Sequence, residues 1–211
     1  MPVCSSTSSP TRPTNIEPSA LSGPWPETYA RLPTITTGTY VLQLIADDLT
    51  AGSTVTTWTS RVGGWSATQS TTSKKPSVVS SAIGGRNAVR FDRVDDALSI
   101  TSFNPGGLSA VTIFVVINVT SSAGDDIIVE SSSNYNTNDG AFIFYKTSGN
   151  KAFLAAQQGG VNNTFQTTAS IAGTAYVISG VDNKSLSTDE ATVWLDGASS
   201  GTRPLNANLT G

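Results

Sequence analysis

Three aspartates, Asp92, Asp95 and Asp96, stand close together between two short apolar runs in residues 84–100 (GGRNAVRFDRVDDALSI). Calcium takes carboxylate oxygens as ligands, and three of them from one turn could supply part of its coordination shell. Aspartate side chains also accept hydrogen bonds from nearby backbone amides, which orders a turn without any metal. The sequence favours the turn and leaves calcium as the one cofactor to consider.

Two further acidic pairs stand where strands are expected to end: Asp47 with Asp48, and Asp125 with Asp126. Calcium bound between two such loops would draw on both, because the ion needs six to eight oxygen ligands. Whether any two of the acidic groups meet depends on the fold. The pairs therefore remain open between a structural and a metal-binding role.

A second set of residues could recognise a sugar. Trp65 follows two glycines, and an indole exposed on a loop can stack on a sugar ring. The loop at 134–140 (NYNTNDG) adds polar groups and an aromatic ring from Asn134, Tyr135, Asn136 and Asp139. The alternative is an ordinary asparagine-rich turn, with Trp65 packed locally.

Histidine and disulfide chemistry are excluded by composition. The chain contains no histidine and a single cysteine, Cys4. This removes histidine-based triads, histidine-ligated zinc and intrachain disulfides.

Charge and hydropathy limit the classes of partner that the protein is expected to bind. The net charge is -3, only 13% of residues are charged, and serine and threonine together number 58. Affinity for nucleic acid depends on clustered lysine and arginine, and no basic cluster here exceeds Lys74-Lys75. No apolar run approaches the roughly 18 residues of a membrane span. We expect a hydroxylated surface and neither a nucleic-acid nor a membrane partner.

The elements that must position these residues are short strands. Segments rich in β-branched and aromatic residues alternate with turns of Gly, Asn, Asp and Ser, and no amphipathic helix is evident. The expected strands are 39–46, 53–60, 87–92, 97–100, 110–119, 126–130, 141–145, 151–156, 164–168, 175–181 and 191–196. The pattern predicts an all-β fold, an antiparallel β-sandwich or jelly roll. Residues 110–119, almost continuously apolar, are expected to form a central strand covered on both faces, and Asp196-Gly197 predicts a hairpin turn.

Residues 1–35 have a different composition from residues 36–211, which we expect to form the β-sandwich. Seven of the ten prolines lie in this first segment, which shows neither helical nor strand periodicity. Proline removes a ladder donor, so an extended arm is expected. Trp25, Tyr29 and Leu32 are spaced along it as apolar anchors. Large apolar side chains are uncommon in a segment that stays fully solvated. We therefore interpret the arm as one that docks on its own domain or on a neighbour.

The region from residue 39 to about 200 resembles the laminin-G-like members of the concanavalin A-like lectin/glucanase superfamily. The features that carry the resemblance are an apolar strand ending in Asp47-Asp48, Trp58, Pro76, the Gly85-to-Asp92 strand, the turn Asp95-Asp96-x-Leu98, and the later runs VTIFVVINV and ATVWLDGA. The resemblance implies a jelly roll with a binding or structural role on an exterior surface, as in bacteriophage tail, fibre and capsid-decorating proteins and secreted adhesins.

Two departures from this family bear on function. Its glucanases carry carboxylates as Glu-x-Asp-x-x-Glu on one strand, and none of the four glutamates here has that spacing. We therefore expect no enzyme. Such modules also usually continue with further strands after the segment corresponding to VWLDGA, whereas this chain stops at Gly211. We expect a fragment, or a sheet closed by a partner or by the arm, because an unfinished sheet leaves an unpaired edge.

The leading hypothesis is a non-catalytic protein of a virion exterior, a capsid decoration or a tail or fibre component. Its partners would be other virion proteins or copies of itself, as a homo-oligomer. The alternative is a carbohydrate-binding adhesin or receptor-recognition module on a phage or bacterial surface, with surface polysaccharide as its ligand and an extracellular or cell-surface location.

Overall fold

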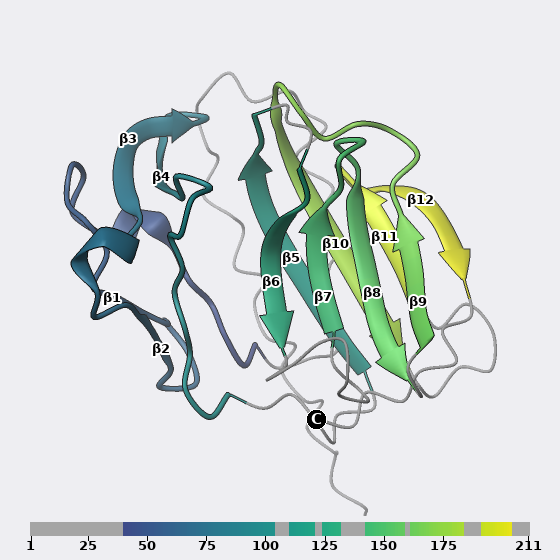
Figure 1. Cartoon of the computed structure of the whole chain (residues 1–211), viewed down its shortest axis with the longest axis horizontal. Coiled ribbons are helices and arrows are strands. Elements are labelled where there is room, and N and C mark those ends of the chain that lie inside the picture. The colour runs from purple at the N-terminus through teal and green to yellow at the C-terminus, as the bar shows by residue number, and fades with distance from the viewer. Residues whose placement is uncertain are drawn as a thin grey trace, which may run out of the picture.

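The computed structural model describes residues 40–103, 110–120, 124–131, 142–158, 161–183 and 191–203. Within these ranges the chain forms antiparallel sheets and two single-turn 3-10 helices, η2 (Ala46–Asp48) and η3 (Thr72–Lys74) (Figure 1). The predicted all-β, antiparallel class is confirmed. No helix in the described ranges is long and apolar enough to cross a membrane.

Residues 40–103, which we call the N-terminal lobe, form two hairpins. β1 (Thr57–Thr59) pairs with β2 (Ser66–Thr68), and β3 (Ser77–Ile83) pairs with β4 (Arg86–Arg90). The lobe buries few apolar side chains; the fully buried ones are Val55, Ala67, Pro76 and Val78. Its order therefore depends heavily on hydrogen bonds and ion pairs.

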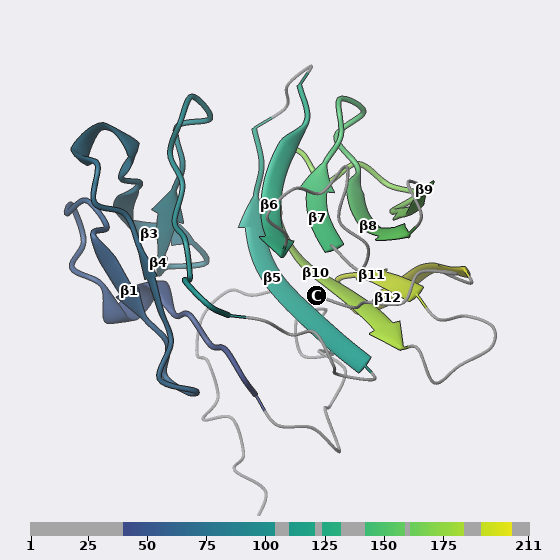
Figure 2. The same cartoon turned by 60° about the horizontal axis from the view of Figure 1, so that its bottom comes forward.

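The remaining strands form two four-stranded sheets, which we call the body (Figures 1 and 2). The first sheet has the order β12-β11-β10-β5, and the second has the order β6-β7-β8-β9. Their bounds are β5 (Ala110–Asn118), β6 (Asp126–Ser131), β7 (Phe142–Lys146), β8 (Ala152–Gln158), β9 (Val161–Gln166), β10 (Ala175–Asn183), β11 (Ala191–Leu195) and β12 (Ala198–Arg203).

Apolar side chains from both sheets meet in one core. Ile178 of β10 and Val193 of β11 are fully buried together with Leu154 of β8. Gly180 of β10 faces Leu154, because a Cβ at this glycine would lie 3.3 Å from a Leu154 methyl group. Alternate residues of β5, namely Val111, Ile113, Val115 and Ile117, pack against this core but are only partly buried.

The predicted hairpin at Asp196-Gly197 is confirmed. β11 and β12 pair across it, and both turn residues have positive φ, 50° at Asp196 and 77° at Gly197. This is the backbone of a two-residue turn whose twist matches that of the flanking strands. The Asp196 carboxylate also accepts a hydrogen bond from the Val177 amide at 2.8 Å.

Several expected strands are absent; residues 97–100, for example, contain only an isolated bridge at Ser99. Residues 41–45 are not a strand: the Gln43 amide donates to Ser60 Oγ, and the Ile45 carbonyl accepts from the Trp58 indole at 3.0 Å. Side chains therefore occupy backbone hydrogen-bonding groups that would otherwise pair with a neighbouring strand. Residues 110–119 do not form a central strand either, because β5 lies at the edge of its sheet and pairs only with β10 among the described strands.

Strands rich in serine were missed. All three residues of β2, all seven of β3 and all six of β12 lie outside the expected strands, and their hydroxyl content resembles that of the loops. In all three, pairing with the partner strand makes the strand, which the local sequence does not predict.

Candidate functional site

The turn from Asp92 to Asp96, which we call the acidic turn, is ordered by its own carboxylates. Asp92 Oδ1 accepts hydrogen bonds from the backbone amides of Val94, Asp95 and Asp96, at 2.8, 3.3 and 3.4 Å. Asp96 Oδ2 accepts one from the Asp92 amide at 2.8 Å. These hydrogen bonds, first that from Val94, lower the pKa of Asp92. The expected turn-forming role is confirmed for Asp92 and Asp96.

The same turn brings together the three residues considered for calcium. Asp92, Asp95 and Asp96 each place one carboxylate oxygen within 4.8 Å of the others. Calcium–oxygen distances are about 2.3–2.6 Å, so three such oxygens could contact one ion. They would supply fewer than half of its usual ligands, and two carboxylate oxygens of the turn already accept amide hydrogen bonds. Calcium binding at this turn therefore remains a hypothesis.

The acidic turn is attached to the body at the start of β6. Arg93, which has a φ of 66°, places its Nε 2.9 Å from Asp126 Oδ1. The second oxygen of Asp126 lies 3.2 Å from Nζ of Lys146, a fully buried lysine that donates to the Gly124 carbonyl at 2.5 Å. Burial raises the pKa of Asp126, but hydrogen bonds from Arg93 and Lys146 outweigh it, so the net shift is downward.

The other half of this acidic pair has a separate, local role. Asp125 Oδ1 accepts a hydrogen bond from the Ser148 amide at 2.7 Å. Asp125 thus ties the chain before β6 to the turn between β7 and β8. Neither member of the pair at 125–126 is free of protein partners, so the pair is structural in this arrangement.

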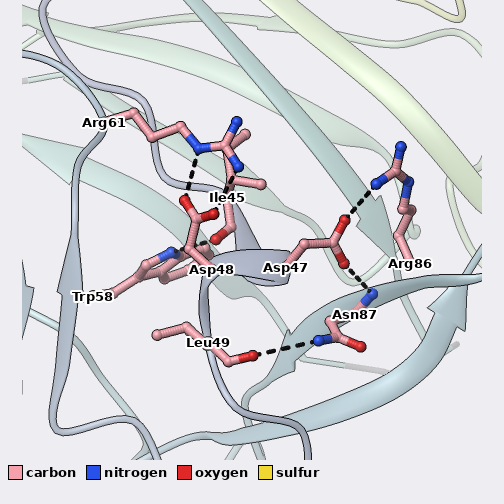
Figure 3. Close-up of polar contacts among 8 residues, drawn as sticks. All are labelled: Ile45, Asp47, Asp48, Leu49, Trp58, Arg61, Arg86 and Asn87. Carbon is pink, nitrogen blue, oxygen red and sulfur yellow. Dashed lines mark hydrogen bonds and ion pairs between the residues drawn. The ribbon is translucent and has the colours of Figure 1, made fainter. Parts of the chain in front are cut away.

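The pair at η2 is also engaged by the protein (Figure 3). Asp48 receives two hydrogen bonds from the Arg61 guanidinium, at 2.6 and 2.7 Å, and this lowers the pKa of Asp48. Asp47 contacts Arg86 Nη1 at 2.8 Å and accepts the Asn87 amide at 2.8 Å. The pair connects η2 to the β1–β2 and β3–β4 hairpins. These contacts explain the presence of two aspartates between apolar segments without invoking a bound metal.

Trp65 is packed rather than presented as a flat platform. Its ring meets Phe103 edge to face, with centroids 5.3 Å apart, and its exposure is intermediate. Gly63, at a φ of 71°, lies against the same indole. The position of Trp65 is thus explained by local packing, which was the alternative to stacking on a sugar.

A polar hollow of about 330 Å³ lies elsewhere on the lobe. Every side chain that lines it carries a hydroxyl or an amide and none carries a charge; they are Thr56, Thr57, Thr68, Gln69, Ser70 and Ser99. Sequence reasoning missed this hollow because it forms only when β1, β2 and the segment around Ser99 come together. The backbone amides of Thr68 and Ser99 each donate a hydrogen bond to the carbonyl of the other.

A serine–lysine spacing was also overlooked. Ser148 and Lys151 stand three residues apart, as a serine nucleophile and a lysine base do in some hydrolases. Residues three apart share a face on a helix. Here Ser148 lies in the turn between β7 and β8, and Lys151 follows the turn, in which the Asn150 amide donates a hydrogen bond to the Thr147 carbonyl at 2.8 Å. The spacing therefore carries no catalytic argument.

β5 and β6 lie on the side of the body that faces the N-terminal lobe (Figures 1 and 2). Both strands are at the edge of their sheets, and each exposes an apolar side chain, Val116 at 55% and Ile127 at 62% (Figures 1 and 2). The register of β6 shifts between Ile127 and Val129, so Val129 packs on the core while Ile127 faces outward. Large exposed apolar side chains on a sheet edge are characteristic of interaction surfaces.

Other predicted site residues lie outside the described ranges. These are Asn134, Tyr135, Asn136 and Asp139 of the candidate sugar loop, and Trp25, Tyr29 and Leu32 of the arm.

Comparisons with known proteins find no match for this chain among protein-family models, curated proteins or solved structures. Its function is therefore argued from the features above.

Proposed function

We propose that the protein is a non-catalytic structural component of a virion exterior, a capsid decoration or a part of a tail or fibre. The observation that carries the proposal is that the edge strands β5 and β6 expose the apolar side chains of Val116 and Ile127. A protein that works alone in solution normally protects such edges. An assembly component uses them for contact.

The proposed architecture is a laminin-G-like β-sandwich of the jelly-roll type. The shared core of the two four-stranded sheets supports it, since Leu154 of one sheet packs on Gly180 and Ile178 of the other. Sandwiches of this kind place their loops at the ends of the sheets and leave outer faces and edges for contacts. This suits a decorating or fibre module.

The chemistry of the surface also supports an exterior role. Only 13% of the residues are charged, and hydroxyl side chains replace ionic ones over much of the sequence. The described carboxylates of Asp47, Asp48 and Asp126 are each neutralised by a cation of the same chain. Such groups hold the fold rather than a reacting substrate.

The arm at residues 1–35 is proposed to tether the protein to the assembly through Trp25, Tyr29 and Leu32. Seven prolines make this segment a poor partner for a regular ladder, and its apolar residues are too few for a core of their own. Deleting residues 2–34 is expected to abolish incorporation into particles. Full incorporation of the deletion variant would contradict the tether.

Gold-labelled antibody against the chain, applied to intact particles from the source that encodes it, tests the proposed location. Labelling of the outer surface is expected, and its position separates a capsid role from a tail role. Particles that remain unlabelled while the unassembled protein in the same preparation binds the antibody would contradict the proposal.

A carbohydrate-binding module is the second candidate, and the polar hollow favours it. Uncharged hydroxyl and amide groups such as Thr57, Gln69 and Ser99 match the hydrogen-bonding groups of a neutral sugar. A glycan array of bacterial polysaccharides, with and without calcium, tests this reading. Binding that is lost in Thr57→Val but kept in a matched variant away from the hollow, Thr112→Val, would support it, and an array without signal would contradict it.

A further inference from the structure

We propose that the N-terminal lobe blocks the edge of β5 from pairing with a strand of another molecule, and that the ion pair between Arg93 and Asp126 holds the lobe in this position. The inference goes beyond the proposed function. It concerns how the chain protects an edge strand of its own body, whatever assembly the protein belongs to.

The edge of β5 carries no protection in its own sequence. β5 is the longest of the edge strands in the two described sheets of the body, and its nine residues, Ala110–Asn118 (AVTIFVVIN), include no charge, no proline and no glycine. The edge strand β6 differs, because it carries Asp126 and Glu130 and a register shift. Charges and bulges keep edges from pairing with other chains, and edges without them are covered by another part of the fold. By this criterion β5 requires a cover.

The lobe lies where such a cover is required. In both views it stands on the side of β5 that is turned away from β10 (Figures 1 and 2). A further strand of this sheet would have to lie on the same side, about 4.8 Å from β5. A folded body that brought such a strand would meet the lobe. The lobe therefore excludes that body for as long as it stays in place.

The described contact between the lobe and the body is polar. Arg93 Nε lies 2.9 Å from Asp126 Oδ1. The apolar neighbours of these two residues are not buried by the contact, since Val94 is 83% exposed and Ile127 is 62% exposed. Attraction between charges, rather than a shared apolar core, thus holds the lobe at this point.

Each part keeps its own core when the two separate. The described core cluster of the body contains side chains from residues 111 to 195 and none from the lobe. The lobe buries Val55, Ala67, Pro76 and Val78, and ion pairs at Asp47 and Asp48 connect its segments. The lobe can therefore leave the body without unfolding.

Arg93 is the partner that can leave this ion pair at low cost. Its side chain is 38% exposed, so its charge can be solvated again. Lys146 is fully buried and lies 3.2 Å from the other oxygen of Asp126. Replacing Asp126 would take the carboxylate away from a buried lysine, whereas replacing Arg93 leaves the pair of Asp126 and Lys146 intact. Arg93 is therefore the residue to substitute.

The distance between two spin labels tests the role of the ion pair. In a Cys4→Ser background, the labels are attached at Ser80→Cys on β3 and at Thr168→Cys after β9, which are both exposed positions. We expect a narrow distance distribution that becomes longer and broader in Arg93→Glu, because two negative charges repel, and that stays narrow in Arg93→Lys. High salt should broaden the distribution without any substitution at Arg93, because salt screens a partly exposed pair. A distribution that neither Arg93→Glu nor salt changes would overturn the proposal.

Light scattering after size exclusion tests the protection of the edge. Arg93→Glu is expected to form larger species than the unsubstituted protein at the same concentration, because the edge of β5 becomes accessible to strands of other molecules. Adding Val116→Lys, which places a charge on β5, should restore the original size. The matched control is Ser80→Lys, which adds the same charge at an exposed position of β3 and should not restore it.

Two results of the second experiment would overturn the protective role. The first is an Arg93→Glu protein whose label distances lengthen while its size stays that of the unsubstituted protein. The second is association that Val116→Lys and Ser80→Lys suppress to the same extent, which would assign it to net charge or to another surface. Both experiments use the purified full chain, so their failure leaves the particle measurements untouched, and absence of the chain from particles leaves this inference untouched.

Discussion

Arg93 and Asp126 join the N-terminal lobe to the body through a contact of 2.9 Å between Nε and Oδ1. Because Lys146 contacts the other oxygen of the same carboxylate, Asp126 connects the exposed acidic turn to a fully buried lysine. The charge of Asp126 therefore contributes to holding the lobe against the body.

Acid is expected to weaken this connection. The pKa of Asp126 is lowered in the folded protein, so its contribution to stability is present above the unfolded value of about 4 and is lost as the pH falls through the folded value. Melting temperatures between pH 7 and pH 2.5 should fall less steeply in Asp126→Asn than in the wild type. Asp95→Asn is the control, since the Asp95 carboxylate has no partner in the described ranges. Parallel curves for the wild type and Asp126→Asn would contradict the role of the ion pair.

The acidic turn is expected to be ordered without calcium. Asp92→Ala removes the acceptor of three amide hydrogen bonds and should lower the melting temperature, whereas Asp95→Ala should leave it nearly unchanged. Wild-type protein should melt at the same temperature in calcium and in chelator. A rise with calcium that disappears in Asp95→Ala would show that the three carboxylates hold an ion.

Two adjacent glycines should differ in their tolerance of alanine. Both have positive φ, but a Cβ at Gly63 would collide with the Val41 carbonyl oxygen and lie 2.7 Å from Cδ1 of Trp65, whereas a Cβ at Gly64 meets nothing within 4 Å. Gly64→Ala should cost only the backbone term of about 1 kcal/mol. Gly63→Ala should cost more and alter Trp65 fluorescence. Equal losses in urea unfolding would contradict the packing of Trp65.

The shared core of the two sheets should dominate stability. Ile178 is fully buried between the sheets, so Ile178→Ala should lower the free energy of unfolding by about 2 to 5 kcal/mol. Val94→Ala, at an exposed valine, should change it by less than about 0.5 kcal/mol. A small effect at Ile178 in urea unfolding would show that the sheets do not depend on one core.

The local patterns in the sequence predicted what depends on neighbours along the chain. The strand at β10 follows from its β-branched residues, the turn at Asp196-Gly197 from its residue types, and the role of Asp92 from the short reach of its side chain to nearby amides. Each is decided within a few residues, where residue type determines the backbone or the hydrogen bond.

The features that were missed depend on contacts between distant segments. An apolar run such as that of β5 suits a covered central strand or an unprotected edge, and only strand order separates the two. The outward position of Ile127 results from a register shift against β7, which no alternation in the sequence announces. The polar hollow needs Ser99 to meet Thr68, 31 residues away.

Quantitative mass spectrometry of purified particles tests the central claim, that this protein is a structural component of a virion exterior. The account predicts the chain at a fixed ratio to the major capsid protein, retained through density-gradient purification and salt washing, and removed by protease from the surface of intact particles. A ratio that falls toward zero during purification, while the protein stays in the soluble fraction, would contradict it.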